Sequence, residues 1–172
     1  MGREKSIHSM DGVYLGGEKE LRVQKIREGT VIDHIPSGYA LAVLRILGIT
    51  GREGNVISVL MNVPSQKLGR KDIVKIEERE LRQDEVDKIA LIAPKATINI
   101  IKDYGVYKKQ PVRLPSTILG VIRCANPRCI SNGGEPVRPT FYVKSEDPLE
   151  LRCHYCGHFM SRDEVIQQLT ST

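Results

Sequence analysis

All four cysteines of this chain lie in its last third, and they form two short pairs. Cys124 and Cys129 enclose four residues, Cys153 and Cys156 enclose two, and 23 residues separate the pairs. Each pair can offer two sulfurs to one metal from a tight turn, and four thiolates around Zn²⁺ complete a tetrahedral shell with no open position. The pattern therefore predicts one structural zinc ion, whose binding contributes directly to the folding of a small domain.

The cysteine pairs have three possible uses other than zinc binding. Four unrelated thiols would not be expected to fall into two short pairs. A redox role for Cys153 and Cys156 lacks the strand-to-helix context of such motifs. An iron–sulfur cluster remains an alternative, although the knuckle-like spacing favours zinc. His154 and His158 lie within the motif, but four cysteines already fill the shell, so we expect both to be ordinary surface histidines.

Composition and proline placement indicate how the chain is divided. The polar N-terminus has no apolar run of a signal peptide, and no segment approaches the roughly 20 apolar residues of a membrane helix. We expect a cytoplasmic protein, in which clustered thiols hold metal more often than they form disulfides. Pro111 and Pro115 mark a boundary. The expected division is a flexible extension at 1–20, a first domain at 21–113 and a zinc-binding domain at 114–172.

Hydrophobic periodicity predicts the fold class, which is α+β. In the first domain, strands are expected at 21–35, 55–63, 72–78, 96–103 and 104–110, and helices at 39–48 and 81–94. The run 55–63 is almost continuously apolar and predicts a buried strand. The order β-α-β-β-α-β is typical of a ferredoxin-like domain with two helices on one face of an antiparallel sheet. The second domain is expected to be small, all-β and zinc-ribbon-like, with strands at 117–124, 140–144 and 149–153 and a terminal helix at 162–169.

Basic residues supply candidates for anion binding. The net charge is +5, which suits an anionic partner without identifying it. Lys71 and Lys75 share one face of a strand, about 13 Å apart, and Lys108 and Lys109 follow another strand candidate. Neither standard glycine-rich phosphate loop is present, so a solvated charged face is the open alternative. The Asp33-His34 pair has no nucleophile beside it, and no active site is assembled.

The zinc domain by itself leaves its purpose open. Zinc ribbons often bind nucleic acid, and basic side chains in this region could meet phosphates, namely Arg123, Arg128, Arg138, Lys144 and Arg152. The same face could instead dock on an acidic protein surface. Stacking aromatics are few, which disfavours single-strand binding, although Tyr142, Tyr155 and Phe159 remain available. A zinc-ribbon nucleic-acid-binding protein is therefore the alternative function.

Several segments resemble a known family in order and spacing. These are GTVIDHIPSG at 29–38, NVPSQKLGRKDIVKIEE at 62–78, DEVDKIALIAPKATINIIKDY at 84–104, and the cysteine region 124–156. They resemble the regulatory chain of aspartate carbamoyltransferase, from about Leu21 to Leu169. The first 20 residues have no counterpart.

The resemblance implies a non-catalytic subunit that regulates pyrimidine biosynthesis. In the family, a ferredoxin-like allosteric domain pairs with a second copy of itself, and a zinc domain docks on the catalytic chain. Two catalytic trimers are bridged by three regulatory dimers. ATP and CTP compete for one site, with UTP as a further effector. No nucleic acid and no membrane are implied as partners, and the loop at 126–128 becomes a candidate contact to the catalytic chain.

The resemblance also implies site residues. The zinc ligands become Cys124, Cys129, Cys153 and Cys156. The nucleotide-binding residues become Val23, Gln24, Lys25, Ile26, Asp33, His34, Lys71, Ile73, Lys75, Asn99, Ile101, Tyr104, Val106 and Lys109. Lys71 and Lys109 would neutralise phosphates, and Lys75 would lie toward the base and ribose. Family members often carry an acid where Gln24 stands, which affects the expected balance between ATP and CTP.

Overall fold

The computed structural model describes residues 24–171. None of its helices is long and apolar enough to cross a membrane. The elements are, in chain order, β1 Gly29–Pro36, α1 Ala40–Ile46, β2 Ile57–Ser65, β3 Gly69–Glu77, α2 Gln83–Ile92, β4 Thr97–Lys102, β5 Gly105–Pro111, β6 Thr117–Leu119, η1 Ile130–Asn132, β7 Thr140–Glu146, β8 Leu149–Cys153, β9 Phe159–Ser161 and α3 Arg162–Thr170.

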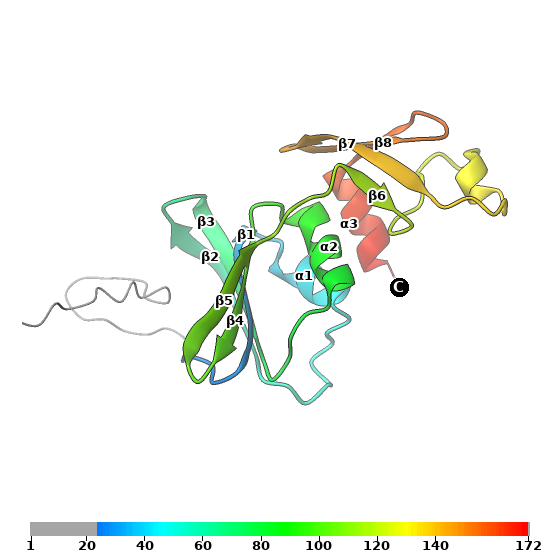
Figure 1. Cartoon of the computed structure of the whole chain (residues 1–172). Coiled ribbons are helices and arrows are strands. Elements are labelled where there is room, and N and C mark those ends of the chain that lie inside the picture. Colours follow the sequence, from blue (N-terminus) through cyan, green and yellow to red (C-terminus); the bar gives the residue numbers. More distant parts are fainter. Residues whose placement is uncertain (1–23, 172) are drawn as a thin grey trace, which may run out of the picture.

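The first sheet confirms the ferredoxin-like expectation. Its strand order is β2-β3-β1-β4-β5, and every neighbouring pair is antiparallel. The first four strands form the β-α-β-β-α-β unit, and β5 adds a further edge strand beside β4. Helices α1 and α2 lie on one side of this sheet (Figure 1). The other face carries no helix in the described part of the chain.

Alternation along the strands divides the apolar side chains between the two faces. On the helix side, Ile32, Val74 and Ile98 are buried in one core with Ile89 of α2. A smaller buried cluster on the opposite face includes Val31, Ile73 and Ile101. The two faces of the sheet therefore differ. The face covered by the helices forms a conventional hydrophobic core, and the opposite face has a small apolar cluster surrounded by basic residues.

Strand β2 departs from the sequence prediction. The apolar run at 55–63 predicts a buried strand, and this prediction is wrong, because β2 is an edge strand. Val59 and Met61 are 37% and 38% exposed. Edge position depends on the order of strands in the sheet, which a local apolar run does not determine. Its register shifts between Leu60 and Val63, where Asn62 has a φ of +59°.

The second sheet is four-stranded and antiparallel, in the order β6-β7-β8-β9. The strand expected at 117–124 is shorter, since β6 ends at Leu119 and Gly120 has a φ of +67°. The chain from Gly120 to Cys124 is therefore loop. The expected terminal helix is present as α3, which Ser161 caps by accepting a hydrogen bond from the Glu164 N–H.

The two domains are in contact through α3. Leu91 of α2 is fully buried in the core of the second domain beside Val165, and Ile166 packs against the first core. Figure 1 shows α3 next to α1 and α2, with the second sheet beyond it. An ion pair of 2.7 Å between Lys95 and Asp147 also joins the two domains.

Candidate functional site

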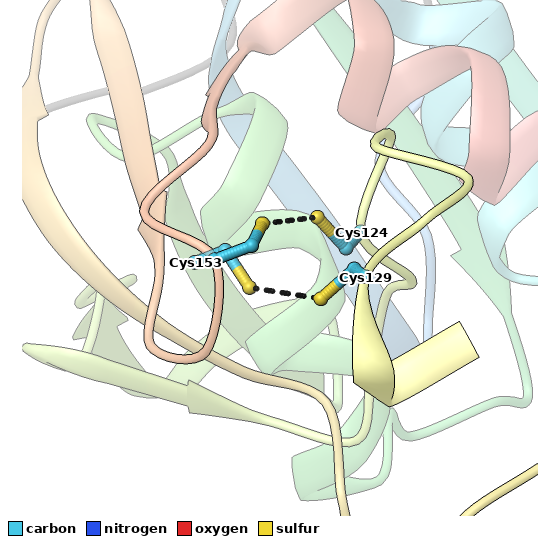
Figure 2. A group of neighbouring side chains, drawn as sticks. Cys124, Cys129 and Cys153 are labelled. Carbon is cyan, nitrogen blue, oxygen red and sulfur yellow. Dashed lines mark hydrogen bonds between the residues drawn. The ribbon is translucent and has the colours of Figure 1, made fainter. Parts of the chain in front are cut away.

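The four cysteines meet at one point. Their sulfurs all lie within 4.8 Å of one another, with Cys124 and Cys156 at 3.5 Å and Cys129 and Cys153 at 3.7 Å. Figure 2 shows Cys124, Cys129 and Cys153 with their sulfurs turned toward a common centre. A tetrahedral ion with metal–sulfur bonds of about 2.3 Å would place its ligands about 3.8 Å apart. The donor set therefore fits one Zn²⁺-sized ion.

Backbone hydrogen bonds fold each pair into a tight turn. In the first turn, the Cys129 N–H donates to the Asn126 carbonyl at 3.0 Å, and the Asn132 side chain donates to the Cys124 carbonyl at 2.8 Å. In the second, the Gly157 N–H donates to the Cys153 carbonyl at 3.0 Å. Gly157 has a φ of +73°, a conformation that glycine adopts without steric cost. Both turns thus aim their sulfurs inward before any ion binds.

The thiols differ in their ease of ionisation. Burial raises the pKa of Cys124 and Cys153 above the usual range. Burial acts in the same direction on Cys156, but hydrogen bonds from the His158 backbone and from Cys124 outweigh it, and its pKa falls to about 6. His154 lies outside the cluster, with its Nδ1 hydrogen-bonded to the Tyr142 hydroxyl at 2.8 Å. Among the described residues, the cluster of potential ligands here comprises the four cysteines.

A second candidate site lies on the face of the first sheet away from the helices. Strand register aligns one residue from each strand in a row: Lys75 pairs with Ser58 and with Val31, Val31 pairs with Asn99, and Asn99 pairs with Lys109. Residues paired in this way project from the same face. Lys75 and Asn99 are only 3% and 2% exposed. Polar side chains are thus buried in the middle of a sheet face.

The hydrogen bonding of this row is incomplete within residues 24–171. The Lys75 ammonium lies 3.5 Å from the Gln24 carbonyl, and the Asn99 side-chain N–H donates to the Val31 carbonyl at 3.4 Å. The Asn99 Oδ1 is buried and has no hydrogen-bond partner in this part of the chain. A buried polar atom without a partner costs free energy, so this acceptor suits a donor on a bound ligand.

A β-bulge brings Asp33 and His34 together at the end of this face. The register of β1 and β3 shifts between Ile32 and Ile35, and His34 has a φ of +58°. Neighbouring residues in a regular strand point to opposite faces, but here the His34 Nδ1 lies 3.4 Å from the Asp33 carboxylate. Lys71 pairs with the same carboxylate at 2.7 Å.

Several cations act on the His34 imidazole. Burial is the largest cause that lowers the pKa of His34, and Lys71, Lys67 and Lys109 lower it further against the opposing effect of Asp33. Lysines from the β2–β3 hairpin and from β5 thus converge near one end of the sheet face. Such a concentration of positive charge suits an anion.

The structure brings most of the expected nucleotide-binding residues to this face. Ile26, Ile73 and Ile101 form its apolar floor, while Gln24 and Lys25 belong to the exposed segment before β1. Val106 pairs with Ile101, and Tyr104 is in the β4–β5 turn with its N–H bonded to the Arg27 carbonyl at 3.1 Å. Both are well exposed, at 48% and 60%. Val23 lies outside the described residues.

Two residues of this face were not expected from the sequence. Val31 occupies the centre of the row, and Lys67 acts on His34 from the β2–β3 connection. The strand order that places Val31 between Lys75 and Asn99 is a tertiary feature. The lysine-rich QKLGRK segment at 66–71 was a usable signal for Lys67.

Comparisons with known proteins match both domains. A family model described as aspartate carbamoyltransferase regulatory chain, allosteric domain, matches residues 21–113. A second, described as the metal binding domain of the same chain, matches residues 116–166.

Full-length relatives carry the same description. The aspartate carbamoyltransferase regulatory chain of Methanothrix thermoacetophila is 63% identical over 139 residues, covering 81% of this chain and 90% of that protein. Those of Hyperthermus butylicus and Thermofilum pendens are 61% and 59% identical, and cover 87% and 90% of this chain and 94% and 98% of those proteins.

Proposed function

This chain belongs to the family of aspartate carbamoyltransferase regulatory chains, and from that premise we propose that it reads nucleoside triphosphates and controls a catalytic partner chain. It is itself the non-catalytic, regulatory subunit. In this proposal ATP and CTP, with UTP as a further effector, bind the face of the first sheet that lies away from the helices, called here the open face. A zinc ion held by the four cysteines stabilises the second domain, which docks on the catalytic chain in the cytoplasm.

The buried polar row carries the nucleotide part of the proposal. Lys75 and Asn99 lie at the centre of the sheet face, and the buried Asn99 Oδ1 has no hydrogen-bond partner among residues 24–171. Lys71 and Lys109 both act on His34 at one end of this face. The arrangement suits a molecule with a polar base and ribose over the row and phosphates against the lysines. Asp33 holds Lys71 in place through their 2.7 Å ion pair.

Zinc is the metal that this donor set favours. Four thiolate sulfurs in a tetrahedral arrangement select zinc or an iron–sulfur centre, and the sulfur separations agree with a single ion. A complete shell leaves no position for a substrate. The Ser131 hydroxyl, 3.2 Å from the Cys129 sulfur, and the backbone bonds of both turns orient the ligands. The ion's role in this proposal is to hold the small domain in shape.

Exposed apolar side chains support partner docking on both domains. Leu119, Ile130 and Phe159 of the zinc domain are 54%, 52% and 50% exposed, and such surfaces mark interaction sites when they are contiguous. We assign these exposed side chains, with the loop at 126–128, to the contact with the catalytic chain. The edge strand β2 exposes Val59 and Met61 and has backbone groups available for pairing. We assign it to the dimer contact with a second regulatory chain.

Nucleotide control requires differential binding. A nucleotide shifts the assembly only if it binds one quaternary state more tightly than the other. Coupling free energies of this kind are typically about 1–3 kcal/mol, or roughly 5- to 150-fold in affinity. In this chain the route from the sheet face to the zinc domain runs through α1, α2 and α3. The contacts of Leu91 and Ile166 across the domain boundary would carry the change.

Two adjacent lysines provide a matched test. Lys109 pairs with Asn99 on the open face, whereas Lys108 pairs with Ile100 and projects from the other side of β5. Lys109→Ala should weaken CTP and ATP binding by about 10-fold or more, because a charge-assisted contact to phosphate is lost. Lys108→Ala should bind as the unmodified chain does. Isothermal titration on zinc-loaded protein measures both.

Equal binding by the Lys109→Ala and Lys108→Ala chains would contradict the phosphate assignment. Copurification with a carbamoyl-transferring catalytic chain tests the partner separately. If that association fails and the chain instead binds oligonucleotides with an affinity that falls steeply with salt, the alternative nucleic-acid function would be favoured.

A further inference from the structure

A cavity of about 300 Å³ lies between the two domains. Its lining includes Arg70 of β3, Lys95 from the connection between α2 and β4, Asp147 from the β7–β8 turn and Arg162 in the first turn of α3. Both domains therefore contribute charged residues to its wall. Its volume is at the small end of the range for ligand pockets, which runs from about 300 to 1,000 Å³.

The charges that line this cavity do not balance. Arg70, Lys95 and Arg162 are cations and Asp147 is the only acid in the lining, which leaves an excess of two positive charges. Lys95 already neutralises Asp147 at 2.7 Å, while Arg162 is farther from it, at 3.8 Å. Two guanidinium groups thus face the cavity with little compensation from carboxylates.

Both arginines keep donors that the described chain does not use fully. Arg70 donates to the Asn62 carbonyl at 2.8 Å and forms no ion pair within residues 24–171. Arg162 donates from Nη2 to the Glu146 carbonyl at 3.3 Å, but its Nε is buried and has no hydrogen-bond acceptor among those residues. A buried N–H without an acceptor is costly, and a small rotation of the Arg162 guanidinium toward an anion in the cavity would remove that cost.

We propose that this interdomain cavity binds the phosphate group of a small anion, with Arg70 and Arg162 as its principal ligands and Lys95 as a third cation. Guanidinium groups present planar, forked donors that match phosphate oxygens in pairs. A ligand held by Arg70 and Arg162 would connect β3 of the first domain to α3 of the second. Anion binding would therefore stabilise one relative placement of the two domains.

This site is separate from the proposed nucleotide site. Arg70 and Lys71 are consecutive in β3, and consecutive strand residues point to opposite faces. Lys71 belongs to the open face with Asp33, whereas Arg70 belongs to the cavity. The cavity is also too small for a whole nucleoside triphosphate, so free phosphate or a compact phosphomonoester is the ligand class.

Phosphate titration of the full-length chain, at low ionic strength, tests the proposal. Inorganic phosphate and phenyl phosphate serve as probes, followed by calorimetry and by the rise in unfolding temperature. The double change Arg70→Gln with Arg162→Gln should weaken binding by about 10- to 100-fold, since contacts to charged groups are lost. As the matched control, Lys109→Ala, which removes a lysine of the proposed nucleotide site, should leave this binding event in place.

Asp147→Asn gives a result that misfolding would not imitate. Asp147 is the acid that competes with a bound anion, so its neutralisation should tighten phosphate binding, by about 2- to 5-fold for a partly exposed charge. Binding of both probes assigns a terminal phosphate group, and binding of inorganic phosphate alone assigns the free ion. The proposal is overturned if neither probe binds, if the Lys109 change abolishes binding while the arginine changes do not, or if Asp147→Asn weakens it.

Discussion

The Lys71 ammonium lies 2.7 Å from the Asp33 carboxylate, and the two side chains are only 14% and 5% exposed. Asp33 also accepts a hydrogen bond from the His34 N–H at 2.6 Å. The Lys71–Asp33 ion pair therefore stabilises the β1 bulge. In the proposed function it also positions a phosphate-binding lysine. A buried ion pair is costly to break from one side, because the remaining charge loses its partner.

Removing Lys71 alone should be more harmful than removing the whole pair. Lys71→Met should lower the free energy of unfolding by about 3–5 kcal/mol, since it leaves the Asp33 carboxylate buried and unpaired. Adding Asp33→Asn should recover most of this loss. Urea unfolding of the two single variants and the double variant, with zinc in excess, measures the coupling. Additive losses would mean that the pair contributes no coupling free energy.

A second buried carboxylate, that of Asp72, predicts a loss of stability of similar size. Asp72 is fully buried and accepts hydrogen bonds from the backbone N–H groups of Gly38 at 2.8 Å, Ala40 at 3.0 Å and Asn62 at 2.9 Å. It thereby joins the start of α1 to the bulge in β2. Asp72→Ala should cost about 3 kcal/mol or more, because unpaired buried N–H groups cost roughly 1–3 kcal/mol each.

Asp72→Asn separates charge from hydrogen bonding at this position. The amide oxygen can still accept from Gly38 and Ala40, but the amide N–H₂ group would face the Asn62 N–H. We therefore expect an intermediate loss, with amide exchange accelerated around the β2 bulge and less change at α1. Thermal unfolding together with hydrogen exchange checks this order. An Asn variant as unstable as the Ala variant would assign the effect to charge instead.

His34 should make the stability of the unliganded chain depend on pH. Its folded pKa is lowered, chiefly by burial, while the unfolded chain takes up the proton near a pKa of about 6.5. The unfolded state thus binds more protons as the pH falls below about 6.5, and stability decreases from there toward the folded pKa.

Asparagine is the appropriate replacement for testing this dependence. His34 has a φ of +58°, a conformation that asparagine tolerates better than most residues. His34→Asn should flatten the fall in stability between about pH 7 and 5, as measured by urea unfolding at each pH. An unchanged slope would mean that another group titrates in this window.

The clustering of the four cysteines and the fold could be predicted from the sequence because both depend mainly on local patterns. The cysteine spacing defines two tight turns, and the alternation of helical and strand periods defines the first domain. The bulge at Asp33-His34 and the exposure of Val59 depend on strand order and register instead. A local pattern does not determine these features.

The interdomain cavity was beyond prediction for a related reason. Arg70, Lys95 and Arg162 are far apart in the chain and carry no common motif. They meet only because α3 docks beside α2 and brings the β7–β8 turn to Lys95. Domain docking of this kind depends on apolar contacts such as those of Leu91, which periodicity assigns only to a generic core.

Loss of one cysteine should unfold the second domain while the first remains folded. That domain has a small core built around Phe141 and Leu151, and structural zinc sites contribute about 10–16 kcal/mol of binding free energy near neutral pH. Cys153→Ser should therefore abolish stoichiometric zinc, measured by elemental analysis. The amide resonances of residues 116–166 should lose their dispersion, while those of β1, β3 and β4 persist.

Ser131→Ala is the matched control for that change. The Ser131 hydroxyl is 3.2 Å from the Cys129 sulfur but is not a ligand candidate, so its removal should keep one zinc per chain and lower metal affinity by about 10- to 100-fold at most, as for other residues that orient metal ligands. Competition with a coloured chelator measures this affinity. A Cys153→Ser chain with full zinc and a dispersed spectrum would contradict this prediction. It would show that three sulfurs hold the ion and that the core around Leu151 keeps the domain folded without the fourth.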